Sequence, residues 1–353
     1  MENIPIIIPS YEPDDRLLKL CEELYKEGLK NVVVVDDGNG KKYEDFFKKI
    51  REKYGFKIII HRINLGKGRG LKDAFNYVLV NMPNAIGCVT ADSDGQHLVK
   101  DIKRMMDELK KHPDELIIGC RNFDSSNVPT KSKYGNKITK FVLGAFCGVK
   151  VSDTQTGLRA IPANMMEDLI DTDGERFEFE TNMLIESKNK YKIRELEIET
   201  VYDSKENHSS HFNPVTDSIK IYRNIFKVFF KYIFASVASF VIDIVLFTCF
   251  CSIFKNLEIG YYIISATVLA RIISSLCNYL LNHKLVFESK KSTKNTLYRY
   301  VLLVIIQMIV SAVAVQILAN TFINTNESII KIVVDTIIFF CNFFIQKYCI
   351  FEK

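Results

Sequence analysis

The pattern of apolar and polar positions changes once along the chain, near residue 210. Before that point, short β-branched runs alternate with stretches of helical periodicity. Alternating strands and helices predict a mostly parallel sheet covered by helices on both faces, and therefore an α/β fold. The strand candidates are 4–8, 31–35, 56–61, 86–91 and 116–120, and the helical stretches are 14–27, 42–54, 69–81 and 98–111.

The second half of the chain is dominated by four long apolar stretches, each able to cross a hydrocarbon core, which takes about 20 residues. They are 232–254, 259–282, 300–323 and 328–350. Apolar and basic residues occupy opposite sides of the segment that precedes them, a pattern typical of a helix lying in a membrane interface. We therefore predict a first domain over 1–212, a juxtamembrane amphipathic helix over 213–230 and a transmembrane domain over 231–353.

The distribution of basic residues predicts the orientation of these spans. Basic residues precede the first span and fill the loop 283–299, whereas 255–258 and 320–327 are nearly neutral. The positive-inside rule then predicts a protein of the cell membrane with the first domain and both termini in the cytoplasm. The chain starts with the strand-like IPIIIPS, so no cleavable signal peptide is expected.

Composition does not indicate a nucleic-acid-binding, disulfide-bonded or zinc-binding protein. A net charge of +5 over 353 residues does not indicate a nucleic-acid partner. Nine cysteines occur without a CxxC pair, which suits a reducing cytosol and indicates neither disulfides nor zinc.

The transmembrane half contains an internal similarity. Segment 271–289 aligns with 335–353, which indicates two hairpins in the same orientation. The matched pairs are Cys277 with Cys341, Asn278 with Asn342, Phe287 with Phe351 and, upstream, Tyr232 with Tyr300.

Three charged residues, Asp243, Arg271 and Asp335, fall inside the predicted spans, where unpaired charge is costly. We expect Arg271 to pair with one of the aspartates and hold the hairpins together. A polar path for a sugar phosphate headgroup is the alternative.

The sharpest chemical signal is TADSDGQH at 90–97, which follows an apolar run. Asp92 and Asp94 are two residues apart in an extended chain and therefore point to one side. Converging carboxylates repel each other and commonly hold a hard divalent cation, and Mg²⁺ favours one or two carboxylates plus substrate phosphates. We therefore expect a metal site at these two residues, with a solvated turn as the alternative.

Other polar residues follow the remaining strands at the same edge of the predicted sheet. PSYE over 9–12 closes the first strand, Asp36-Asp37-Gly38 closes the second, and NLGKG over 64–68 follows the third. In open α/β sheets, ligands bind beyond the carboxyl ends of the strands. Acidic groups there can reach a base or ribose, and Lys67 can reach a phosphate.

The ordered set PSYE, VVDDG, NLGKG, ADSDGQ, GCR and DTQTGLRA resembles family 2 glycosyltransferases of the dolichyl-phosphate-mannose-synthase-like branch, over about residues 4–212. The membrane half resembles the four-helix GtrA-like domains of bacterial lipid-linked glucosylation systems. The resemblance implies a GT-A fold and a membrane enzyme. Its implied reaction is the inverting transfer of one sugar from a UDP- or GDP-sugar to a polyprenyl phosphate such as undecaprenyl phosphate, for cell-envelope glycosylation. Assembly into a homo-oligomer is left open.

The resemblance also implies roles for the residues at the strand ends. The donor nucleotide-sugar would be bound by Pro9, Tyr11, Glu12, Asp36, Asp37, Lys67, Asp92 and Gln96, with Mg²⁺ or Mn²⁺ on Asp92 and Asp94. Asp94, Asp153 and Arg121 are the expected catalytic residues, and Asp153 would face the donor sugar. Its alternative role is a turn or helix cap.

The acceptor side needs cations more than a general base, because a phosphate is mostly ionised at neutral pH. The candidates are Arg121, Lys131, Lys133, Lys137 and, by likeness in the SSHF stretch, His211. Glu178 and Glu180, on a possible strand, are second choices for lining that side.

The chain departs from the family pattern at two points. Many members have YNE where this chain has Tyr11-Glu12-Pro13. The chain also has no tryptophan, so the QxxRW motif of processive synthases is absent. Transfer of a single sugar is therefore favoured. The alternatives are a processive polysaccharide synthase and a transporter of lipid-linked sugar whose cytoplasmic domain binds nucleotide-sugar.

Overall fold

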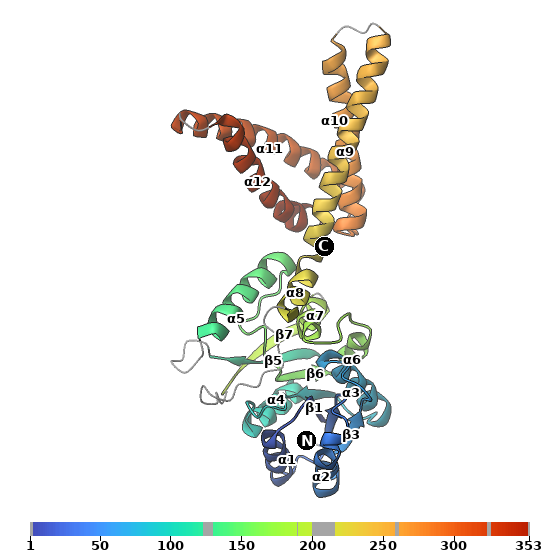
Figure 1. Ribbon diagram of the computed structural model, residues 1–353, viewed down its shortest axis with the longest axis vertical. Helices are drawn as coiled ribbons and strands as arrows, with labels where there is room; N and C mark the ends of the chain where they lie inside the picture. Colours follow the sequence, from blue (N-terminus) through green and yellow to red (C-terminus); the bar gives the residue numbers. More distant parts are fainter. Residues whose placement is uncertain are drawn as a thin grey trace. The chain divides into compact units, whose positions relative to one another are not determined.

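The computed structural model describes residues 3–122, 130–188, 190–199, 216–257, 261–322 and 326–351. The chain forms two compact units, Met1–Ile225 and Phe226–Lys353 (Figure 1). Each unit has its own architecture.

The first unit is built on a seven-stranded sheet in the order β3-β2-β1-β4-β6-β5-β7. The five predicted strands are β1 (Ile6–Ser10), β2 (Val32–Asp36), β3 (Lys57–Ile60), β4 (Gly87–Thr90) and β5 (Glu115–Arg121). Two further strands, β6 (Arg159–Pro162) and β7 (Lys192–Ile198), complete the sheet. All neighbouring strands are parallel except β6, which runs antiparallel to both β4 and β5.

Helices cover both faces of this sheet, as predicted. The helices are α1 (Asp15–Lys26), α2 (Glu44–Tyr54), α3 (Lys67–Asn81), α4 (Val99–Lys111), α5 (Thr130–Val142), α6 (Ala163–Ile170), α7 (Glu178–Ser187) and α8 (Thr216–Ile225), with short helical turns η1 (Lys41–Tyr43) and η2 (Leu143–Cys147). Alternate residues of the central strands enter two separate cores: Ile6 and Ile8 pack with α1, α2 and α4, whereas Ile7 packs with α3, α6 and α7. This two-sided burial explains the continuous β-branched runs.

Two segments differ from their predicted structure. The possible strand containing Glu178 and Glu180 is the helix α7, because Phe179, Met183 and Leu184 recur at helical spacing and are buried in the core. The amphipathic helix expected over 213–230 is described from residue 216 and ends as α8 at residue 225, where a new helix begins after Phe226. Ile221 and Ile225 of α8 are buried in the core of the first unit.

The second unit consists of two helical hairpins. The first contains α9 (Lys227–Asn256) and α10 (Tyr262–Leu281), the second α11 (Thr293–Thr321) and α12 (Glu327–Ile345). A π-helical turn extends each second helix: η3 (Asn282–Val286) follows α10, and η4 (Gln346–Phe351) follows α12. Within the part of the chain that the structure describes, four helices are long and apolar enough to cross a membrane, and they match the four predicted spans.

The hairpins meet through residues that the internal alignment pairs with each other. The rings of Phe287 and Phe351 are stacked with centroids 5.1 Å apart, and Asn282 Nδ2 donates to Gln346 Oε1 over 3.0 Å. Aromatic contacts are also reciprocal, since the Tyr232–Phe343 centroid distance is 5.3 Å and its counterpart between Tyr300 and Tyr279 is 5.4 Å. These reciprocal contacts give this unit an approximate internal two-fold symmetry.

The charges in the spans are paired within each hairpin. Arg271 Nη2 lies 3.2 Å from Asp243 Oδ2, and Ser274 donates to the other oxygen of Asp243 over 2.7 Å. Asp335 accepts hydrogen bonds from Lys331 at 2.8 Å and Ser311 at 2.6 Å. The predicted pairing of Arg271 with an aspartate is confirmed, but the pair joins α9 to α10 inside the first hairpin and does not hold the two hairpins together.

Candidate active site

The ends of β1 and β2 are tied together by one side chain, Asn39. Its backbone N–H and its Nδ2 donate to Asp36 Oδ1 over 3.0 and 2.6 Å, and Nδ2 also donates to the carbonyl of Ser10 over 3.1 Å. Its Oδ1 accepts from the backbone N–H of Glu12, a residue in the left-handed conformation with φ of 47°. Asp36 therefore supports the predicted nucleoside-binding segment 9–12 through Asn39.

Asp37 acts on the loop that follows β3. Its Oδ1 lies 2.8 Å from His61 Nδ1 and accepts from Leu65 N over 2.9 Å, and its Oδ2 accepts from Gly66 N over 2.8 Å. The residue is only 3 % exposed. Both carboxylate oxygens thus accept hydrogen bonds from the protein, and these contacts fix the conformation of the 64–66 loop.

Asp92, at the end of β4, is held from three sides. Oδ1 accepts from Lys67 Nζ over 2.6 Å, and Oδ2 lies 3.2 Å from His97 Nε2. A Cβ at Gly157 would overlap the carboxylate, so the glycine of the DTQTGLRA motif (153–160) leaves the space that Asp92 fills. Lys67 also lies 3.0 Å from Glu180 Oε1 on α7, which makes a chain of alternating charges.

Asp94 lies two residues further along, where its Oδ1 accepts from the backbone N–H of Gln96 over 3.1 Å. Burial and the negative charge of Asp92 raise the pKa of Asp94. Burial also opposes ionisation of Asp92, but the ammonium of Lys67 and the imidazole of His97 outweigh it and lower the pKa of Asp92. Burial likewise disfavours the charged form of Lys67, yet Asp92 and Glu180 raise its pKa. The two aspartates therefore crowd negative charge at one strand end, a situation that a cation relieves.

The donor set fits a divalent cation that is completed by its substrate. Among the described residues, no three His, Cys, Asp or Glu side chains converge as a metal cage. Mg²⁺ is commonly held by one or two carboxylates together with substrate phosphates, and it does not require such a cage. Asp92 and Asp94 are the residues that would hold it.

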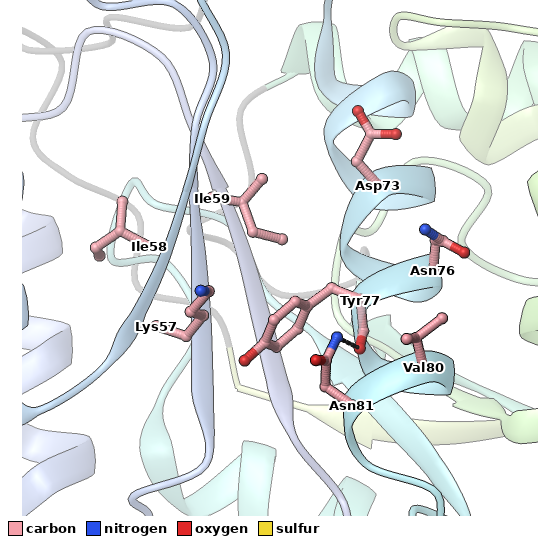
Figure 2. Close-up of a pocket in the computed structure, with 8 residues that line it drawn as sticks. All are labelled: Lys57, Ile58, Ile59, Asp73, Asn76, Tyr77, Val80 and Asn81. Atoms are coloured by element: carbon pink, nitrogen blue, oxygen red, sulfur yellow. Dashed lines mark hydrogen bonds between the residues drawn. The ribbon is translucent and has the colours of Figure 1, made fainter.

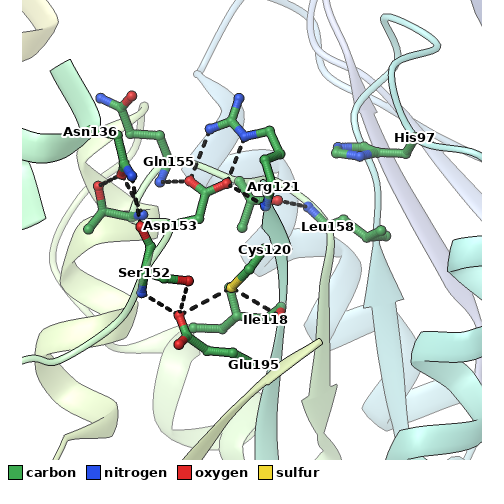
Figure 3. A network of polar contacts seen from close by, with 12 residues as sticks. His97, Ile118, Cys120, Arg121, Asn136, Ser152, Asp153, Gln155, Leu158 and Glu195 are labelled. Atoms are coloured by element: carbon green, nitrogen blue, oxygen red, sulfur yellow. Dashed lines mark hydrogen bonds and ion pairs between the residues drawn. The ribbon is translucent and has the colours of Figure 1, made fainter. Parts of the chain in front are cut away.

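Arg121 and Asp153 form a second charged feature, at the end of β5 (Figure 3). Arg121 Nε donates to Asp153 Oδ2 over 2.7 Å and Nη2 donates to Oδ1 over 3.0 Å. Asp153 is fully buried, and its Oδ1 also accepts from Gln155 N over 3.1 Å. The structure brings together these two predicted catalytic residues, and each is a principal partner of the other.

The loop that carries Asp153 is held by two polar residues from neighbouring elements (Figure 3). Asn136 of α5 donates to the carbonyl of Ser152 over 2.7 Å and accepts from Thr154 N over 3.0 Å. Glu195 of β7 accepts from the Ser152 hydroxyl over 2.8 Å. These contacts hold Asp153 in place between α5 and the sheet.

The remaining predicted residues lie in several places. Pro9 is buried in β1, and Tyr11 and Glu12 follow the end of that strand. Lys133 and Lys137 lie exposed on α5. The side chain of Lys131 and all of His211 lie outside the described residues.

Sequence reasoning missed His97 and Arg159. His97 ends the TADSDGQH motif itself, so its proximity to the carboxylates could have suggested it. Arg159 is fully buried and donates to the carbonyls of Thr156 and Glu180 over 3.1 and 2.7 Å. An arginine at the start of a short apolar segment was the available signal.

A pocket of about 350 Å³ opens elsewhere in this unit, between β3 and α3 (Figure 2). Its lining residues are Lys57, Ile58, Ile59, Asp73, Asn76, Tyr77, Val80 and Asn81. None of them is a predicted site residue.

Comparison with known proteins identifies the class of both halves. The mostly parallel α/β sheet and the four apolar helices that follow it agree with two family matches, which together define a multi-pass membrane glycosyltransferase. Residues 6–170 match the model of glycosyl transferase family 2, and residues 223–351 match that of the GtrA/DPMS transmembrane domain. The chain belongs to glycosyltransferase family 2.

Individual relatives are archaeal proteins. An uncharacterized protein of Methanocaldococcus jannaschii is 30 % identical over 206 residues, which cover 57 % of this chain and 82 % of that protein. The UDP-N-acetylglucosamine–dolichyl-phosphate N-acetylglucosaminyltransferase of Methanococcus voltae is 28 % identical over 221 residues, covering 56 % and 86 % of the two chains. Among solved structures, glucosyl-3-phosphoglycerate synthase from Mycobacterium tuberculosis, in complex with Mn²⁺, uridine diphosphate and phosphoglyceric acid, gives a TM-score of 0.45 at 12 % identity, covering 63 % of this chain and 75 % of that one.

Proposed function

We propose that this enzyme transfers a single sugar, with inversion, from a UDP- or GDP-sugar to a polyprenyl phosphate in a reaction that depends on Mg²⁺ or Mn²⁺. The observation that carries the proposal is the Asp92–Asp94 pair, crowded at the end of β4 with Lys67 against it. The family membership and the dolichyl-phosphate acceptor named for the Methanococcus voltae relative support the choice of acceptor.

The donor would be bound across the ends of β1, β2 and β4. Asp36 and Asn39 hold the segment that follows β1, and Asp37 holds the loop that leads into α3. When bound, the metal on Asp92 and Asp94 would neutralise charge on the departing nucleoside diphosphate. The backbone N–H groups at the start of α3 favour an anion, since a helix N-terminus carries partial positive charge.

The acceptor phosphate needs positioning and little activation, because it is already ionised at neutral pH. Arg121 is oriented by its two contacts to Asp153, so its guanidinium has a defined direction at the end of β5. In this proposal Arg121 contacts the acceptor phosphate, and Asp153 is a positioning residue that acts through Arg121.

Helix α5 supports delivery of the acceptor from a bilayer. Tyr134, Ile138 and Phe141 recur along one side of the helix and are 61 %, 55 % and 73 % exposed, next to the exposed Lys133 and Lys137. Exposed apolar residues flanked by lysines are typical of helices that lie at a membrane surface. The lysines would attract the lipid phosphate while the apolar side chains enter the acyl region.

The test is incorporation of labelled sugar into lipid. Membranes containing the protein would be supplied with a panel of UDP- and GDP-sugars and with undecaprenyl or dolichyl phosphate, and label in organic extracts would be measured. We expect one donor to give labelled lipid, and Asp94→Asn to lower the rate by about 10²–10³-fold through loss of transition-state charge stabilisation. Transport of lipid-linked sugar without its synthesis, or full activity of Asp94→Asn, would contradict the proposal.

A further inference from the structure

Lys67 occupies a constrained position between two carboxylates. It is the first residue of α3, and its Nζ lies 2.6 Å from Asp92 Oδ1 and 3.0 Å from Glu180 Oε1. Its side chain is largely buried. Two different elements, β4 and α7, thus present negative charge to one ammonium group.

The glycines on either side of Lys67 explain how it gets there. Gly66 has φ of 104°, which favours glycine, and a Cβ on Gly68 would lie 2.6 Å from Phe179 Cβ. The start of α3 can therefore press directly against α7. This close packing places the ammonium between Asp92 and Glu180, and a larger residue at position 66 or 68 would force it away.

The position creates a competition at Asp92. An ammonium and a divalent cation would share one carboxylate, and two cations a few ångströms apart repel each other strongly away from bulk water. A donor diphosphate changes this balance, since it offers Lys67 a new anion to bind. The contact with Glu180 would keep the lysine next to the site once it left Asp92.

We propose that Lys67 is an internal counter-cation that couples metal binding to donor binding. Lys67 neutralises Asp92 before the donor arrives and weakens the binding of a divalent cation alone. The donor diphosphate then draws Lys67 from Asp92, and the metal binds together with the nucleotide. This inference rests on the proposed function, because it assumes that Asp92 and Asp94 hold the metal.

The test measures the binding of Mn²⁺ to the purified full-length protein. Electron paramagnetic resonance quantifies the free ion, with and without UDP or GDP. In the wild-type protein we expect weak binding of Mn²⁺ alone and much tighter binding with nucleotide. Lys67→Met removes the charge but keeps the length of the side chain. It should tighten the binding of Mn²⁺ alone by about tenfold and reduce the effect of nucleotide by a similar factor, the usual size of coupling between two sites.

Lys72→Met is the matched control. Lys72 lies on the same helix and is buried against Glu175, with Nζ 3.0 Å from Oε1, and it has no contact with Asp92. Its substitution should leave Mn²⁺ binding unchanged, whereas Lys67→Arg should keep the wild-type behaviour because it keeps the charge.

The outcomes separate this inference from the proposed function. If Lys67→Met binds Mn²⁺ alone no more tightly than the wild-type protein does, Lys67 does not compete with the metal and the coupling is refuted. If the wild-type protein binds no Mn²⁺ even with nucleotide, or if Asp94→Asn binds it equally well, the metal site itself is refuted. If the wild-type protein is catalytically active but Lys67→Met does not change the binding of Mn²⁺, the coupling is refuted and the proposed function stands.

Discussion

Arg121 and Asp153 meet through two parallel contacts of 2.7 and 3.0 Å, and the aspartate is fully buried. Planar, two-point pairing of this kind fixes the direction of the guanidinium as well as its distance. The pair joins the end of β5 to a loop 32 residues further along the chain. Its consequences for stability and for catalysis can be separated.

Asp153→Asn should destabilise the first unit and reduce acceptor binding. Removing one partner of a buried pair leaves the other charge without compensation, which costs about 3 kcal/mol. Denaturant unfolding measures the first effect, and steady-state kinetics at low temperature measure the second as an increased KM for polyprenyl phosphate. An unchanged acceptor KM in a folded Asp153→Asn variant would show that the pair only stabilises the fold.

Gly157→Ala should impair the proposed metal site, because the new Cβ would overlap the carboxylate of Asp92. We expect at least a tenfold loss of activity, since small displacements of catalytic groups are costly. Gly135 on α5 provides the control, because nothing lies within 4 Å of a Cβ built there. Gly135→Ala should keep activity and favour the helix by about 0.5–1 kcal/mol. Equal activity of the two variants would contradict the placement of Gly157 against Asp92.

Asp37→Asn should weaken donor binding without direct loss of a donor contact. The asparagine amide can accept at one position only, so one of the N–H groups of Leu65 and Gly66 would lose its acceptor. The loop that leads to Lys67 would then be less ordered. Donor KM should rise while kcat changes less, and a loss of kcat at unchanged KM would argue against this role.

Arg271→Leu should destabilise the membrane unit by leaving Asp243 without its cation. An uncompensated charge inside a span costs about 2.5–3.5 kcal/mol on insertion scales. The double variant Arg271→Leu with Asp243→Leu should recover much of the lost thermal stability in detergent, because it leaves no unpaired charge. Additive losses in the double variant would show that the two residues are not coupled.

Much of the fold was predictable because burial on both faces of the sheet leaves a strong local signal. The β-branched runs located β1 to β5, and helical periodicity located α1 to α4. β6 was not found, since it has four residues, contains Arg159 and Pro162, and is a strand only through pairing with β4 and β5. The helix α7 was mistaken for a possible strand because Glu178 and Glu180 alternate with phenylalanines.

The sequence indicated which polar residues lie at the strand ends, but not which partners they contact. Strand ends and the DxD spacing pointed to Asp36, Asp37, Asp92 and Asp94, since these positions follow local structure. That Asp37 binds a loop 28 residues away, or that Lys67 is shared with Glu180, depends on tertiary packing. No local pattern encodes which partner a charged side chain selects.

The stacked rings of Phe287 and Phe351 carry an implication for the origin of the membrane unit. A residue that touches its own counterpart must lie on or near a two-fold axis. An ancestral single hairpin would therefore have dimerised with an identical copy, both inserted the same way up. Duplication and fusion of the gene for such a self-associating hairpin would give the single chain seen here.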